Sequence, residues 1–266
     1  MPRLTAESFR RPADLSDPRD PAALYVRSYL LIRTLVGLVG ILLPVALFAG
    51  EAAFVRGPVR VRDSLSAYYH TPMQDVFVGG LSVVAFLLLA YLAAQPWTWD
   101  FWLSSLAGVA LLVVVFFPIG RSGLPPGAPR CGSAPEPAGC SPTEQLFGEQ
   151  PVASVHIAAS AVFILSLAAL CFLFARRVAQ HDRDRRTAAF ETGCGVLILV
   201  AVAWIAVGSA TGSRLGPLSA TYSGEVACIW SFGAAWLVRG LDLRRLLLPR
   251  RRRPAREWGT GDPMPL

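Results

Sequence analysis

The chain has 266 residues, of which 53% are hydrophobic and 16% are charged, against about 25% charged in a typical soluble domain. Such an apolar composition excludes an intrinsically disordered chain, a coiled coil and a disulfide-rich miniprotein. The net charge is +7, and all 25 basic residues are arginines that flank apolar blocks. We therefore expect a lipid bilayer, and not nucleic acid, as the partner.

Six apolar segments are long enough, or nearly so, to cross a bilayer as helices, which needs about 20 residues. In chain order they are Ser28–Ala49, Asp75–Ala94, Trp102–Ile119, Ser154–Phe174, Ala188–Ala210 and Tyr222–Val238. An open chain in lipid satisfies its backbone hydrogen bonds only within helices. We therefore predict an all-α fold, a six-helix transmembrane bundle over residues 28–240. The segment 1–27 precedes it and a basic tail, 241–266, follows.

Arginine is distributed unevenly between the two sides of this threading. One side holds 18 arginines, in segment 1–27, the connections 95–101 and 176–187, and the tail after Val238. The other side holds six, in loops 50–74, 120–153 and 211–221. Because arginine-rich segments remain in the cytoplasm, we expect both termini there, in a protein of the cell (inner) membrane.

Two arginine features near the cytoplasmic side are interpreted through the bilayer. Arg33 lies inside the first predicted helix, near its cytoplasmic end, and we expect its side chain to snorkel to the lipid headgroups. The stretch Leu241–Arg256 mixes leucine with arginine, which predicts binding to anionic lipids of the inner leaflet. The exclusive use of arginine, with abundant alanine, glycine and proline, is typical of GC-rich coding, and we expect a bacterial source.

The cysteines fall into two groups. Cys171, Cys194 and Cys228 lie within apolar segments, as small buried hydrophobic residues do. Cys131 and Cys140 lie in the loop 120–153, which is rich in proline and glycine. We expect this second pair to form a disulfide, which agrees with a loop on the oxidising, extracytoplasmic side.

Polar residues gather where three predicted helices begin on the extracytoplasmic side. His70 and Asp75 lie at the start of the second helix, His156 at the start of the fourth, and Glu225 at the start of the sixth. Polar side chains at membrane depth are costly and therefore indicate function. We predict a polar pocket at this face.

The chemistry of such a pocket has two open interpretations. His70, Asp75, His156 and Glu225 offer the nitrogen and oxygen ligands of a divalent metal such as zinc. Alternatively, Ser66 is a nucleophile with His70 and Asp75, because Ser66 and His70 are four residues apart and share one face of a helical turn. Asp75 as an N-cap and Glu225 as a partner of its helix dipole are the structural alternatives.

The stretch Ser66–Asp75, followed by Val-Phe-Val-Gly-Gly80, resembles a group of bacterial multi-pass membrane proteins of unknown function. That resemblance implies a location and little chemistry. Ser66 with His70 also resembles the serine–histidine motif of the alkaline ceramidase-like membrane hydrolases, which carry a metal. The sequence departs from that superfamily in having Ser160 where a second histidine is expected after His156, and six helices instead of seven.

These observations favour a membrane protein with a binding or structural role and an outward-facing polar pocket. The first alternative is a lipid or amide hydrolase, metal-dependent or not, that uses Ser66, His70, Asp75, His156 and Glu225. The second is a small transporter. No phosphate-binding loop, zincin motif or nucleophile elbow occurs in the sequence, so whether the protein is an enzyme stays open.

Overall fold

The computed structural model of the protein describes residues 21–54, 61–91, 97–121, 123–182 and 184–247. Three predictions lie partly outside the described residues. These are the segment 1–27, the end of the second predicted helix, and the arginine side chains of the basic tail. The described chain is mostly helical, as predicted.

Six long α-helices correspond to the six predicted segments. They are α1 (Pro21–Phe54), α2 (Gln74–Ala90), α3 (Trp99–Phe116), α5 (Glu149–Arg177), α6 (Arg185–Thr211) and α7 (Ala220–Leu247). By length and composition, α1, α3, α5 and α6 can cross a membrane, and α2 is a shorter apolar helix. These helices support the prediction of a helical membrane protein. That all six cross the bilayer stays a prediction.

Several short elements were not predicted. They are the 3-10 helix η2 (Ser66–His70), helix α4 (Pro142–Phe147), the π-helix η3 (Val178–Asp182) and the two-residue strands β1 (Arg214–Leu215) and β2 (Leu218–Ser219). The strands pair antiparallel. Helix α4 begins with a capping box, in which the side chains of Ser141 and Glu144 each accept a hydrogen bond from the other residue's backbone N–H. The sequence Ser141-Pro-Thr-Glu144 carried that signal.

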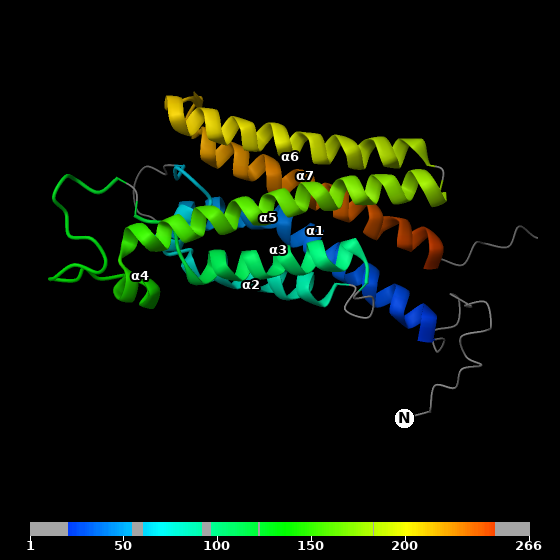
Figure 1. The fold of residues 1–266 in the computed structure, drawn as a ribbon, viewed down its shortest axis with the longest axis horizontal. Coiled ribbons are helices and arrows are strands. Elements are labelled where there is room, and N and C mark those ends of the chain that lie inside the picture. The colour runs from blue at the N-terminus through cyan, green and yellow to red at the C-terminus, as the bar shows by residue number, and fades with distance from the viewer. Residues whose placement is uncertain (1–20, 55–60, 92–96, 122, 183, 248–266) are drawn as a thin grey trace, which may run out of the picture.

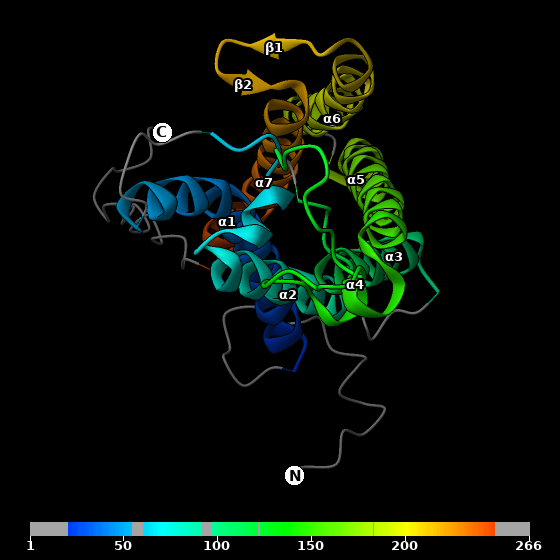
Figure 2. The ribbon, with the colours of Figure 1, turned by 90° about the vertical axis from the view of Figure 1, so that its left-hand side faces the viewer.

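The long helices form one bundle with two different ends (Figure 1). The loop end carries η2, α4, the disulfide-containing loop and the β1–β2 hairpin, which projects beyond α6 and α7 in Figure 2. The opposite end carries the start of α1, the α5–α6 connection and the end of α7. Helices α5 and α6 lie close together at η3 and further apart toward the loop end (Figure 1).

Helix α1 packs closely on α7. A Cβ atom at Gly37 would lie 2.8 Å from the backbone oxygen of Gly233, and one at Gly233 would lie 3.0 Å from the backbone oxygen of Gly37. Only residues without a side chain allow the two backbones to approach this closely. This contact brings Trp236 of α7 toward the interior of the bundle, where its side chain is fully buried.

Arg33 does not snorkel, so that prediction was wrong. Its side chain is only 2% exposed. The guanidinium carbon lies 4.1 Å from the centre of the Phe174 ring and 5.1 Å from that of Trp236, and Nη1 donates a 3.0 Å hydrogen bond to the Tyr91 hydroxyl. Aromatic rings of α5 and α7 cover this face of α1 and provide cation–π contacts in place of water.

Two acidic residues accompany Arg33 at the opposite end. Glu191 of α6 is fully buried and interacts electrostatically with Arg33. Asp100, in the first turn of α3, is also fully buried and forms an ion pair with Arg177 at the end of α5. The Asp100–Arg177 ion pair joins α3 to α5, and the ring contacts of Arg33 join α1 to α5 and α7.

Candidate functional site

A cavity of about 570 Å³ lies at the loop end, between α5, α6 and α7. Most of its wall is apolar, formed by Ile157, Ile164 and Leu165 of α5 and by Val202 and Ile205 of α6. This size falls within the roughly 300–1,000 Å³ of sites that bind small molecules. Because the side chains of Ile157 and Leu165 are 61% and 48% exposed, the cavity is open sideways, where lipid would surround a membrane protein.

The polar residues of the cavity are concentrated in one part of its wall. Ser66 of η2, His156 of α5 and Glu225 of α7 all line it, and Ser66 and His156 are buried. Three of the five residues predicted for a site are therefore brought together. The elements that carry them are separated by long stretches of chain and meet only in the folded bundle.

Ser66 and His156 are in direct contact. The Nε2 atom of His156 lies 2.9 Å from the Ser66 hydroxyl oxygen, and its Nδ1 atom lies 2.7 Å from the backbone oxygen of Phe117. Helix α5 begins at Glu149, earlier than predicted, so His156 lies about two turns inside the helix and at the depth of η2.

The hydrogen-bond partners determine how the imidazole is protonated. A carbonyl oxygen can only accept a hydrogen bond, so in the neutral ring Nδ1 carries the proton that is donated to Phe117. Nε2 is then an acceptor, and the Ser66 hydroxyl donates to it. This is the arrangement of a serine nucleophile and its general base, in which a third group orients the base.

Glu225 positions the chain beside the serine. Its Oε2 atom accepts a 2.6 Å hydrogen bond from the backbone N–H of Leu65, the residue before Ser66. Glu225 lies in the second turn of α7, which begins at Ala220, so it is not a first-turn partner of the helix dipole. The carboxylate therefore fixes η2 against α7 at the cavity wall.

The rim of the cavity is polar and exposed. Asp63 forms a 3.7 Å ion pair with Arg214 of β1, and its backbone oxygen accepts a hydrogen bond of 2.5 Å from the Ser219 hydroxyl. Ser209 and Thr221, whose hydroxyl oxygens are 3.3 Å apart, also line the rim. The cavity thus combines an apolar interior with a polar margin at the loop end.

His70 and Asp75 do not line this cavity. The His70 Nε2 atom lies 2.6 Å from the backbone oxygen of Ile119, which ties η2 to the chain after α3. Asp75 is exposed in the first turn of α2, whose N-cap is Met73, so Asp75 is not the cap. Neither residue is positioned as the partner of Ser66 that the sequence spacing suggested.

The described residues contain no group of three or more histidine, cysteine, aspartate or glutamate side chains that could hold a metal ion. The proposed ligand set of His70, Asp75, His156 and Glu225 is therefore not assembled as one centre. His70 and His156 each hydrogen-bond a backbone carbonyl oxygen, which occupies one ring nitrogen of each.

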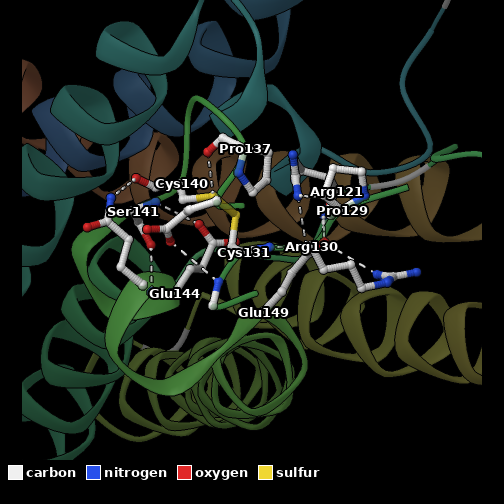
Figure 3. Close-up of a disulfide and its surroundings, with 12 residues drawn as sticks. Arg121, Pro129, Arg130, Cys131, Pro137, Cys140, Ser141, Glu144 and Glu149 are labelled. Atoms are coloured by element: carbon white, nitrogen blue, oxygen red, sulfur yellow. Dashed lines mark hydrogen bonds and ion pairs between the residues drawn. A yellow bond between two sulfur atoms is a disulfide. The ribbon is translucent and has the colours of Figure 1, made fainter. Parts of the chain in front are cut away.

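The lobe, the segment 123–148 that carries Cys131 and Cys140, projects from the loop end of the bundle (Figure 1), and the two cysteines form a disulfide (Figure 3). The buried Glu149 accepts hydrogen bonds from the backbone N–H groups of Arg121 (2.8 Å) and Cys131 (3.3 Å), and it forms an ion pair with the Arg121 side chain. The side chain of Arg130 also lies 3.5 Å from Glu149. The carboxylate joins Arg121, just before the lobe, and Cys131 within it to the start of α5.

This lobe holds part of the candidate site in place. Glu149 fixes Arg121, and the chain just before Arg121 supplies Gly120 to the cavity wall and the Phe117 oxygen to His156. Sequence reasoning did not identify Glu149 or Arg121. A glutamate after a glycine at the start of an apolar segment was the available signal, but its partners lie 18 to 28 residues away.

The fold and the laterally open cavity define a helical membrane protein with a candidate small-molecule site. Residues 38–239 match the DUF998 family, described as proteins of unknown function. The match covers more than half of the chain, so the protein belongs to this family, which confirms the resemblance to an uncharacterised family. No curated protein and no solved structure matches the chain. The bacterial source and the ceramidase-like resemblance stay predictions.

Proposed function

We propose that the protein binds an amphipathic lipid in the cavity at its loop end. One observation carries this proposal: the cavity is apolar along α5 and α6 and polar where Ser66, His156 and Glu225 meet. An acyl chain fits the first part and an ester or headgroup the second. The sideways opening would let a lipid enter from the bilayer without crossing water.

The proposal includes a topology. Six helices cross the inner membrane, both termini are cytoplasmic, and the loop end faces the extracytoplasmic side. The arginine distribution supports this orientation, because 18 arginines lie on one side of the threading and six on the other. The disulfide between Cys131 and Cys140 also supports it, because disulfides persist in oxidising compartments. The basic tail then contacts anionic lipids of the inner leaflet.

Lipid binding can be tested with the full-length protein in nanodiscs that contain a phosphatidylethanolamine with a diazirine on its acyl chain. Photo-crosslinks should map to the cavity-lining residues Ile164 and Val202. Ala161→Trp should fill the cavity and abolish these crosslinks, because Ala161 lines it. Ala158→Trp is the matched control, since Ala158 is also exposed on α5 but does not line the cavity.

Crosslinks at Ile164 and Val202 that are equally strong in both variants would show that lipid contacts the outside of the bundle only, and would contradict the proposal. The orientation has its own test. A membrane-impermeant maleimide added to intact cells should label Cys131 and Cys140 only after reduction. If a reporter fused after Leu266 were active only when exported, the proposed orientation would be wrong.

A further inference from the structure

We propose that Ser66 and His156 form a nucleophile–base pair that hydrolyses an acyl ester of the lipid held in the cavity. This inference rests on the proposed lipid-binding function, because the cavity must present the ester to the serine. It goes beyond binding by assigning a reaction, two catalytic residues and a substrate class.

The first argument is the geometry of the pair. The Ser66 hydroxyl lies 2.9 Å from Nε2 of His156, within the distance required between a nucleophile and its base. The Phe117 carbonyl oxygen, 2.7 Å from Nδ1, accepts the Nδ1–H hydrogen bond and so leaves Nε2 able to accept a proton. In the well-known triads a carboxylate takes this orienting role. A neutral carbonyl stabilises the charged imidazolium less, so a slow enzyme is expected.

The second argument is the location of the pair. A serine and a histidine that served only to satisfy each other would need no access to open space. Both instead line a cavity of about 570 Å³ whose remaining wall is largely apolar. Glu225 holds the backbone of Leu65 and thereby the position of Ser66, which makes Glu225 a positioning residue. A substrate carbonyl in the cavity can therefore reach the serine oxygen.

The reaction follows from the atoms present and from water as the co-reactant. The Ser66 oxygen bonds to the acyl carbon of the ester while its proton moves to Nε2 of His156. The bond between the acyl carbon and the alcohol oxygen then breaks, and His156 returns the proton to the departing alcohol. Water attacks the acyl-serine, gives a proton to His156, and releases the fatty acid as Ser66 regains its proton.

The lining of the site points to a class of substrate. The apolar walls of α5 and α6 favour a long acyl chain, and the polar rim at Asp63 and Arg214 favours a glycerol or headgroup portion near water. A base that is oriented by a neutral carbonyl gives less assistance than one oriented by a carboxylate. An ester is therefore favoured over an amide, because an ester is the more reactive acyl group and needs less assistance. Ser160, one turn beyond His156 on α5, lines the same cavity and offers a hydroxyl donor.

The experiment uses the full-length protein in nanodiscs, a fluorophosphonate probe, and release of fatty acid from a phosphatidylglycerol ester measured by mass spectrometry. The wild type should be labelled at Ser66, and peptide mapping would identify the adduct directly even if a variant failed to fold. Ser66→Ala should abolish labelling, and His156→Gln should lower the rate by about 100-fold or more. Ser154→Ala is the control, because Ser154 is exposed on α5 outside the cavity.

The wild-type rate should also fall at acid pH as His156 becomes protonated, because a protonated Nε2 cannot take the proton of Ser66. Absence of both labelling and fatty acid release, with acyl-chain crosslinking intact, would overturn the catalytic proposal and leave lipid binding in place. If the wild type formed no acyl-chain crosslinks at the cavity, the lipid-binding function would be contradicted instead. Labelling of a serine other than Ser66 would likewise overturn the assignment.

Discussion

The two ends of the bundle both bury polar side chains, yet they do so in different ways. At the opposite end, Arg33 is enclosed by aromatic rings and accompanied by Glu191, so its charge holds helices together. At the loop end, Ser66 and His156 contact each other beside open space. A polar residue at membrane depth is therefore not evidence of a site by itself. The space next to it separates a structural role from a chemical one.

The largest expected effect tests the structural role of the opposite end. Arg33→Leu should lower the free energy of unfolding by about 3–5 kcal/mol, because it removes the cation enclosed by the Phe174 and Trp236 rings and the donor to the Tyr91 hydroxyl. Arg33→Lys keeps the charge but loses the planar contact with Phe174. Its free energy of unfolding should therefore lie between those of the wild type and Arg33→Leu. Thermal unfolding in nanodiscs measures both. If Arg33→Leu were as stable as the wild type, the stability of the opposite end would not depend on this charge.

A smaller effect is expected from the lobe at the loop end. Replacing Cys131 and Cys140 with serine should cost about 2–3 kcal/mol of local stability, because the open chain regains conformational freedom. Hydrogen exchange should speed up in residues 123–148 and stay unchanged in α1 and α7. Faster exchange throughout the bundle would show that the lobe and the opposite end unfold together.

The close approach of α1 and α7 gives a matched pair of glycine variants. Gly37→Ala places a Cβ atom 2.8 Å from the backbone oxygen of Gly233 and should destabilise the protein by about 1–2 kcal/mol. Gly79→Ala on α2 meets nothing within 4 Å and should be neutral or stabilise by about 0.5–1 kcal/mol. Equal melting temperatures for the two variants would argue against tight packing of α1 on α7.

The smallest effect concerns the cavity rim. Arg214→Ala removes an ion pair with Asp63 in which the side chains are 50% and 62% exposed. Exposed pairs contribute about 0–1 kcal/mol, so the melting temperature should stay nearly constant. A large loss of stability would mean that the rim, like the opposite end, is structural. Thermal unfolding at low and high salt distinguishes these outcomes.

The sequence predicted the helices better than their contacts. Apolar blocks of about 20 residues located all six long helices, since length and hydropathy are local properties. Arg33 was misread because snorkelling was inferred from depth alone, while the rings of Phe174 and Trp236 that enclose it come from distant helices. The rotation of each helix about its axis, which decides what a residue faces, is set by packing and not by hydropathy.

The candidate site was predicted in part. Ser66, His156 and Glu225 were named, and the structure brings them to one cavity. The pairing of Ser66 was predicted from spacing as His70, four residues away, but the histidine in contact is 90 residues away. Spacing along the chain reports neighbours within one helix turn only. Contacts between segments come from the fold, and so does the orienting oxygen of Phe117.

The cavity draws its polar groups from η2, from the chain after α3, and from α5 and α7. Glu225 lies on α7, the last helix of the described residues, and its side chain anchors the backbone of Leu65 in the first half of the chain. During synthesis, Ser66 and His156 therefore emerge long before Glu225, which holds the position of Ser66. The pocket is completed only when α7 has docked, so a chain interrupted before α7 would lack the finished site.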